Sequence, residues 1–257
     1  MSPSGQPILK CFDWQAADPL FTSPASAPKD HPMVKVIVSK NGQEQEFLIH
    51  KEMVTVHKPK FFTTILGPVG ESDIFKIEED PEVFFGLLQY AYRGRFWHPS
   101  TVNDIKNLWN IYIYAEKKDM KYLQDIMMNR ITAFYYRTKT FPSMDTIVYV
   151  YGQTQAESAI NPPSMARRFL SRCHLSISIN CTFGVKYVES TERIAEVLLK
   201  TEGLLFDTLA ATRKPEGIPW KVDLDPRKAK SCDYHQHKWN EKCPNIKETP
   251  FDSETDN

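Results

Sequence analysis

The residues best suited to chemistry in this chain are two cysteines and two histidines near its C-terminus. They are Cys232, His235, His237 and Cys243, all within one short stretch. Two thiolates and two imidazoles are the ligand set of a structural tetrahedral zinc site, and close spacing allows a single loop to supply all four. A bound metal would order a stretch that contains few apolar residues. A structural zinc site is therefore one interpretation of this segment.

The spacing of these four residues also supports a second interpretation, a solvated polar loop without metal. It matches none of the established zinc-finger patterns. His235 and His237 would point to opposite sides of an extended chain. A catalytic metal is disfavoured, because no neighbouring Glu is placed as a base and four protein ligands leave no open coordination position. The sequence predicts no catalytic residue and no cofactor other than this zinc.

The remaining cysteine and histidine residues are expected to be structural. Cys173 and His174 are neighbours, and on a helix neighbouring side chains point about 100° apart, so they form no thiolate–imidazole dyad. Cys173 is better interpreted as a small core residue. No Ser, Cys or paired carboxylate lies at a spacing from His50, His57 or His98 that would indicate a catalytic or ligand-binding site. His50 is expected to satisfy backbone groups where a strand meets a helix.

Composition places limits on the class of protein. The 257 residues contain 32 Lys plus Arg and 32 Asp plus Glu, so the neutral chain gives no electrostatic reason to expect nucleic acid or an anionic membrane as partner. Five cysteines are too few for a disulfide framework. No signal peptide or membrane-length apolar run is seen, which predicts a cytoplasmic or nuclear location. No Gly-x-Gly-x-x-Gly or Gly-x-Ser-x-Gly motif occurs, so neither an enzyme nor a small-molecule substrate is expected.

A β-hairpin is the clearest element that the sequence predicts. Val34, Val36 and Val38 alternate with more polar residues, with the two-residue period of a strand. Asn41-Gly42 supplies the two residues that a type I′ turn needs, and the second strand is predicted to end near Ile49. A short helix near 53–56, a helix over 59–66 that begins at a proline, and a third strand over 74–77 follow.

Seven further helices are predicted from caps and apolar stripes. Asp80-Pro81 is a cap followed by a proline in the first turn, and Thr101 with Asp104 resembles a capping box. A helix break is expected near Gly203. The predicted stripes are Val83, Phe84, Leu87, Leu88 and Ala91; Ile105, Leu108, Trp109, Tyr112 and Ala115; and Tyr122, Leu123, Ile126, Met127 and Phe134. Later helices are predicted over 143–152 and 163–175, with two more within 186–209.

The order of these elements resembles the BTB/POZ family over residues 33–135. The resemblance is carried by several short motifs in the correct order rather than by one specific motif. The motifs are the hairpin, His50-Lys51, Pro59-Lys60-Phe61-Phe62, Phe75-Lys76-Ile77, Pro81-Glu82-Val83-Phe84, and Leu88-Gln89-Tyr90-Ala91-Tyr92-Arg93-Gly94. Val54 and Lys58 depart from the Leu and Ser that the family usually has there. The chain has no kelch repeats or tandem zinc fingers, and in this respect it resembles the small fungal members of the family.

The resemblance implies an α+β, predominantly helical fold with a three-stranded sheet and helical hairpins, followed by a C-terminal helical extension. Four segments are expected. They are an irregular Pro/Ser/Ala-rich arm over 1–32, a BTB/POZ domain over 33–135, a helical extension over 141–213, and a linker with the Cys-His segment and an acidic tail over 214–257.

The function that the resemblance implies is protein–protein interaction, through self-association or recruitment of a partner. Some BTB/POZ members bind a cullin scaffold and bring substrates to ubiquitin ligation, and others serve transcription regulators. The alternative is a zinc-dependent DNA-binding transcription regulator that uses the segment from Cys232 to Cys243. Basic residues Arg227-Lys228-Ala229-Lys230 precede that segment, but they lack a helical period.

Overall fold

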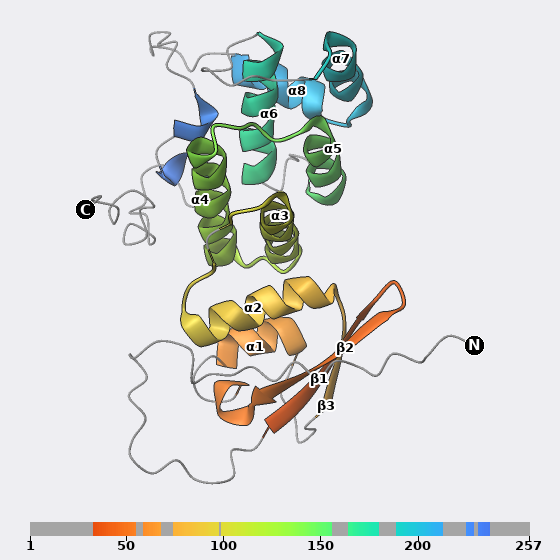
Figure 1. Ribbon diagram of the computed structural model, residues 1–257, viewed down its shortest axis with the longest axis vertical. Helices are drawn as coiled ribbons and strands as arrows, with labels where there is room; N and C mark the ends of the chain where they lie inside the picture. Colours follow the sequence, from red (N-terminus) through yellow and green to blue (C-terminus); the bar gives the residue numbers. More distant parts are fainter. Residues whose placement is uncertain are drawn as a thin grey trace. The chain divides into compact units, whose positions relative to one another are not determined.

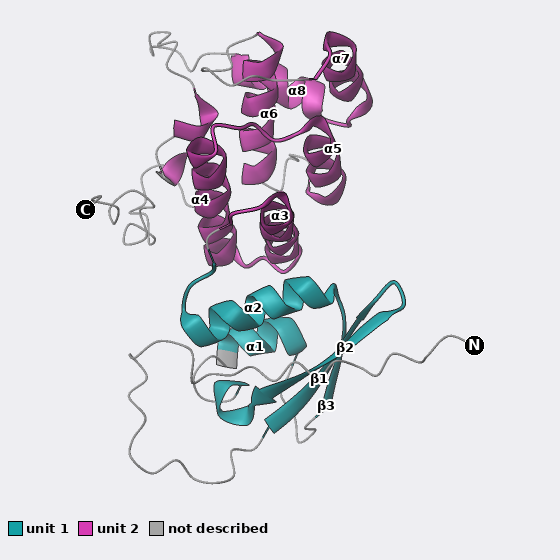
Figure 2. Ribbon diagram, viewed as in Figure 1, with its two compact units in different colours: residues 1–97 teal, residues 98–257 magenta. Residues whose placement is uncertain are grey.

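A computed structural model describes residues 33–54, 59–67, 74–97, 99–155, 164–179, 189–212, 225–228 and 231–236. Within these ranges the protein is a mostly helical α+β structure, as predicted, with a three-stranded sheet and eight α-helices (Figure 1). The chain divides into two compact units, residues 1–97 and 98–257 (Figure 2).

The N-terminal unit is built on the predicted hairpin. Strands β1 (Met33–Lys40) and β2 (Gln43–His50) are antiparallel, and Lys40 pairs with Gln43 across the turn. Asn41 and Gly42 have φ values of 51° and 78°, so both adopt the left-handed conformation that a type I′ turn requires. Strand β3 (Ile74–Glu78) pairs parallel to the other edge of β1, giving the order β2-β1-β3.

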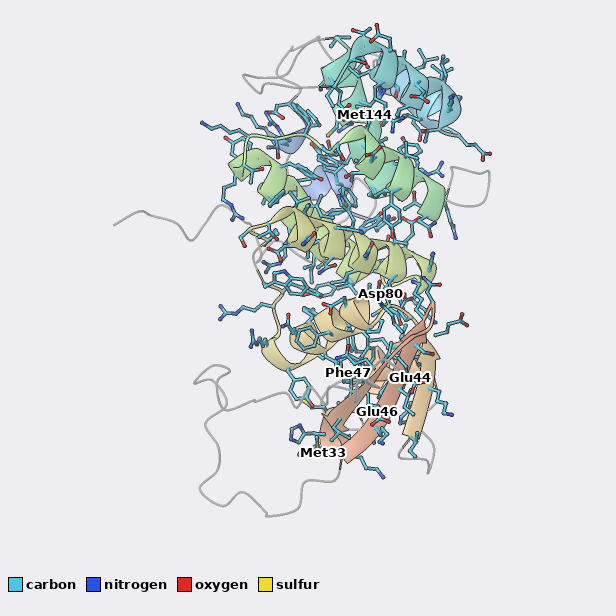
Figure 3. All side chains as sticks on the ribbon, turned by 45° about the vertical axis from the view of Figure 1, so that its right-hand side comes forward. Met33, Glu44, Glu46, Phe47, Asp80 and Met144 are labelled. Atoms are coloured by element: carbon cyan, nitrogen blue, oxygen red, sulfur yellow. The ribbon has the colours of Figure 1, made fainter. Side chains whose placement is uncertain are left out.

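One face of this sheet carries the core of the N-terminal unit. Val34, Val36 and Val38 are fully buried, as their alternation predicts. Phe47 of β2 packs edge-to-face against Phe84, with ring centroids 4.9 Å apart, and lies between the sheet and the helices (Figure 3). The longer helices described in this unit are α1 (Pro59–Leu66) and α2 (Pro81–Arg93), and residues 51–54 form a helical turn that overlaps the short helix predicted near 53–56.

The predicted residues at both ends of α2 cap the helix. The Asp80 carboxylate accepts a hydrogen bond of 2.9 Å from the backbone N–H of Glu82, and Pro81 occupies the first turn. Gly94 ends the helix with φ 68°, and its N–H donates to the Tyr90 carbonyl. Both ends are therefore fixed by residues that the sequence identifies.

Helices are the only regular secondary structure among the described residues of the C-terminal unit. Its first helix begins at the predicted capping box, in which Thr101 and Asp104 bond to each other's backbone N–H groups. Gly203, with φ 81°, marks the predicted break between the last two α-helices. The elements are α3 (Val102–Lys117), α4 (Lys121–Arg137), α5 (Met144–Gln153), α6 (Met165–Ser178), α7 (Thr191–Lys200), α8 (Leu204–Thr212), and the 3-10 turns η3 (Pro226–Lys228) and η4 (Ser231–Tyr234).

The division after Trp97 falls inside the 33–135 stretch that the resemblance treats as one domain. Contacts between α3 and the later helices account for this division. The Tyr112 hydroxyl lies 3.2 Å from the Ser164 hydroxyl and accepts a 3.2 Å hydrogen bond from the backbone N–H of Ala166. Helix α3 thus shares a core with the segment predicted as the helical extension. Tyr122, predicted to lie on a buried stripe, is instead half exposed.

The described helices also bear on the membrane prediction. None of them is both long enough and apolar enough to cross a bilayer.

Candidate functional site

The Cys-His stretch is partly docked on the helices of the C-terminal unit. We use the term tail segment for residues 225–228 and 231–236, which contain η3 and η4. Both turns contact α4 and α6. Of the four predicted zinc ligands, Cys232 is partly buried and His235 is buried, whereas His237 and Cys243 lie outside the described residues.

His235 is held by polar residues of α4. Its Nε2 atom lies 2.8 Å from the side-chain oxygen of Asn129, and the next backbone N–H, of Gln236, donates a 2.8 Å hydrogen bond to Asp125. Asp125 and Asn129 are four residues apart, so they lie on the same face of α4. Both are buried. This face of α4 therefore binds the end of the tail segment through two polar contacts.

The start of the tail segment is held by a buried ion pair. Arg227 donates from Nε and Nη2 to the two carboxylate oxygens of Asp225, each at 2.8 Å. Its Nη1 atom donates to the Thr140 carbonyl at 3.2 Å, and the guanidinium lies 4.3 Å from the Phe141 ring centroid. The two side chains are only 3% and 2% exposed. This bidentate geometry satisfies charges that would otherwise be costly to bury.

Tyr234 joins the two halves of the tail segment and packs on α6. Its hydroxyl donates to the Pro226 carbonyl at 3.1 Å, and its ring meets Phe169 edge-to-face at 5.3 Å. The Arg172 guanidinium lies 5.5 Å from the same ring centroid. Burial raises the pKa of Tyr234 above its usual value, so the phenol stays protonated.

The described half of the predicted zinc set constrains how a metal could bind. Cys232 and His235 are three residues apart at a 3-10 turn, where such side chains share a face. Because Nε2 of His235 faces the Asn129 oxygen, zinc would have to use Nδ1, and Asn129 would orient the ring as outer partners of metal-binding histidines do. Among the described residues no three His, Cys, Asp or Glu side chains form a metal-binding group. The zinc site stays a prediction.

The structure places Cys173 and His174 in separate buried environments on α6. The His174 ring faces the Ile194 carbonyl of α7 at 3.2 Å through Nε2 and the Ser178 hydroxyl at 3.3 Å through Nδ1. Cys173 is fully buried, and burial raises the pKa of its thiol well above the usual value. Its side chain therefore has the character of a core residue rather than a nucleophile.

Burial of Cys173 predicts an unreactive thiol in the folded protein. A short pulse of iodoacetamide at pH 8 should leave Cys173 unmodified, because both accessibility and thiolate fraction are low. Cys232, which is partly exposed, serves as the internal comparison. Peptide mass spectrometry after the pulse measures both sites, and denaturant should make them equally reactive. Rapid labelling of native Cys173 would contradict its placement in the core.

Burial of His174 predicts loss of stability in acid. Burial lowers its folded-state pKa below the usual 6.5, so the unfolded chain binds more protons at mildly acidic pH. Stability is then fully present above about pH 6.5 and falls as pH drops towards the folded pKa, by at most about 1.4 kcal/mol per pH unit. Denaturant unfolding between pH 5 and 8 measures this slope. His174→Gln should flatten it, and identical slopes in both proteins would contradict the prediction.

His50 ends a strand, as predicted, and it contacts a side-chain hydroxyl of α2. It is the last residue of β2, and its backbone N–H donates a 3.1 Å hydrogen bond to the Tyr92 hydroxyl of α2. Its ring Nδ1 lies 3.0 Å from the same hydroxyl. The pair ties the end of the hairpin to the helix. His57 and His98 lie outside the described residues.

A buried arginine connects three helices of the C-terminal unit. Arg167 of α6 donates from Nη2 to the carbonyls of Tyr151 and Thr154 at 2.7 and 2.8 Å, at the end of α5. Its guanidinium also lies 4.7 Å from the Tyr151 ring centroid. The Tyr151 hydroxyl in turn donates to Asp207 of α8 at 3.0 Å. This network is structural, since it satisfies the carbonyl groups at a helix end.

Helix α8 has one buried side and one exposed side. Leu204 and Thr208 are buried against the rest of the unit. Leu205, Phe206 and Leu209 share the other side by their spacing and are exposed, Phe206 by 69%. Large exposed apolar side chains are typical of surfaces that contact other molecules when they are contiguous.

Sequence reasoning missed the residues that hold the tail segment. Asp225, Arg227 and Tyr234 were assigned to a linker. One signal was available, since Asp125 and Asn129 are polar residues at helical spacing among the apolar residues of α4. Buried polar groups need partners, so such a pair predicts a docked segment.

The chain matches no protein-family model, no curated protein and no solved structure. Any functional conclusion therefore rests on the residues and contacts described above.

Proposed function

We propose that this chain is a protein–protein interaction module of the BTB/POZ type, which self-associates or recruits a protein partner. The order of elements in the N-terminal unit carries the proposal. A tight hairpin is followed by helix α1, by strand β3 parallel to β1, and by α2 with its Asp-Pro start. This is the order that the sequence resemblance implies, and the three-stranded sheet supports it.

The positions of the motif residues give further support. Asn41-Gly42 forms the hairpin turn, His50 bonds to Tyr92, and Phe62 is fully buried. Gly94 ends α2. Residues with such roles determine the fold, and the surface around them would determine which partner binds.

One role within this proposal is that of a substrate adaptor for a cullin-type ubiquitin ligase. In that role the N-terminal unit would contact the scaffold and the helical C-terminal unit would select the substrate. The alternative of a DNA-binding regulator is disfavoured by Arg227. A basic contact to phosphate needs an accessible cation, whereas this guanidinium is buried and paired with Asp225.

The proposal is tested with the full chain as an affinity bait, followed by mass spectrometry, and by light scattering for self-association. Two matched variants assign any interaction to a unit. Phe84→Asp places a charge in the core of the N-terminal unit and Phe169→Asp does so in the C-terminal unit, since both rings are buried. We expect Phe84→Asp to abolish cullin binding or self-association, and Phe169→Asp to retain that interaction. A monomer that captures no protein, or self-association and cullin binding that are lost only with Phe169→Asp, would contradict the proposal.

A further inference from the structure

The tail segment is bound to the C-terminal unit in the manner of a peptide ligand. Its contacts come from a few anchoring side chains and not from a shared sheet or a long helix. Arg227 pairs with Asp225 and reaches the Thr140 carbonyl, Tyr234 packs on α6, and His235 bonds to α4. Arg and Tyr are the residue types that dominate binding energy at interfaces.

We propose that the surface of α4 and α6 beneath the tail segment is a peptide-binding surface whose occupant, residues 225–236 of this chain, is exchangeable with the same peptide from a second copy. The binding chemistry is that of a peptide with an Asp-Pro-Arg anchor followed by Tyr-His. The inference does not depend on the BTB/POZ assignment, because every residue that carries it lies in the C-terminal unit.

The receiving surface is held together by contacts that do not involve the tail segment. Trp109 of α3 donates a 3.3 Å hydrogen bond to the Tyr135 hydroxyl of α4. The Gln124 side chain of α4 bonds to the Ala115 carbonyl of α3, and α6 is joined to α3 through Tyr112. These contacts fix α4 and α6 to the same helix. The surface can therefore persist when its occupant leaves.

The surface is also partly polar, which lowers the cost of exposing it. Asp125, Asn129 and Arg172 contact the tail segment and would regain water on its release. The amide nitrogen of Asn129 is buried and has no hydrogen-bond partner among the described residues. An unsatisfied buried donor lowers the stability of the docked state relative to the released one. Docking is thus specific, but it leaves one buried donor of the surface unpaired among the described residues, which favours exchange.

Connectivity explains why the chain's own tail segment is the resident occupant. Residues 213–224 link Thr212, at the end of α8, to Asp225. A covalently linked peptide has a high effective concentration at its own surface, so it outcompetes a free peptide of equal affinity. Exchange of the same element between two copies needs no new contacts.

The test starts from the folded full chain with a protease recognition sequence placed within 214–222. After cleavage, a fluorescein-labelled peptide of residues 225–236 is added under reducing conditions and its anisotropy is followed. We expect saturable binding to the cleaved protein, at least tenfold weaker binding to the uncleaved protein, and displacement by unlabelled peptide. A peptide carrying Arg227→Lys and Tyr234→Ala should bind at least tenfold more weakly.

Three results would overturn the proposal. The first is a cleaved tail that never exchanges with excess peptide while circular dichroism shows a folded protein, which would make the tail a permanent part of the core. The second is unfolding of the helices when the cleaved tail is removed by gel filtration. The third is equal binding of the native and substituted peptides, which would mean that the anchors do not determine recognition.

Discussion

Replacing Arg167 with methionine is expected to lower the free energy of unfolding of the C-terminal unit by about 2–6 kcal/mol, because it removes the donor for two buried carbonyl groups. Each buried acceptor left unsatisfied costs about 1–3 kcal/mol. The carbonyls of Tyr151 and Thr154 both lose their short bonds to Nη2. Methionine keeps much of the apolar volume of the side chain. The decrease in the free energy of unfolding therefore measures the loss of hydrogen bonds rather than the creation of a cavity.

Urea unfolding monitored by circular dichroism measures the Arg167→Met effect. The neighbouring Arg168→Met is the matched control, since Arg168 is exposed and its loss should cost no more than about 0.5 kcal/mol. Arg167→Lys should fall between the two, because an ammonium group can reach the carbonyls but cannot also reproduce the bond from Nε to the Thr154 hydroxyl. Equal stability of the Arg167 and Arg168 variants would show that the network contributes nothing.

The fold was predictable wherever a few neighbouring residues determine the local conformation. Asn41-Gly42 determines the turn, Asp80-Pro81 starts a helix, and Gly94 ends it. Each signal acts within a few residues, so no knowledge of the rest of the chain is required. The three strands and the helices of both units follow from such signals and from apolar periodicity, whereas a sheet that includes β3 was implied only by the family resemblance.

The contacts made by the tail segment were not predictable in the same way. Arg227 bonds to a carbonyl 87 residues earlier, and Gln236 bonds to Asp125 across 111 residues. Nothing near these residues in sequence distinguishes a buried ion pair from a solvated one. Gly203 illustrates the same limit, since the break was predicted but its proximity to Arg167 was not. A Cβ atom at Gly203 would lie 3.0 Å from the Arg167 guanidinium.

The candidate zinc ligands show that a local sequence pattern does not reveal the surroundings of its residues. Two thiols and two imidazoles predict a metal site on composition alone. In the structure His235 is buried against Asn129, so the environment on α4 now restricts any metal to Nδ1. Stoichiometric zinc by elemental analysis, lost with Cys232→Ser, would establish the site. A metal-free protein of unchanged stability would show that the docked segment needs no zinc.

Replacing Arg227 with methionine is expected to destabilise the docked tail segment by about 3–5 kcal/mol, the cost of leaving one charge of a buried pair uncompensated. Asp225 would then be a buried carboxylate without its bidentate partner. The chain can avoid that cost by releasing the tail segment. The loss in global stability is therefore capped at the free energy of docking, and the larger change should be local.

Hydrogen exchange of residues 225–236 and the labelling rate of Cys232 measure this local change, and both should rise strongly in Arg227→Met. Lys228→Met is the matched control, because Lys228 is exposed and one residue away. The double variant Asp225→Leu with Arg227→Met should recover much of the protection, since apolar residues can replace a buried ion pair at little cost. If the amide hydrogens of the tail segment exchange at the same rate in Arg227→Met and Lys228→Met, the ion pair does not hold the tail segment. Strong protection in the double variant would show that packing on Phe141 and Phe169 is enough to hold it.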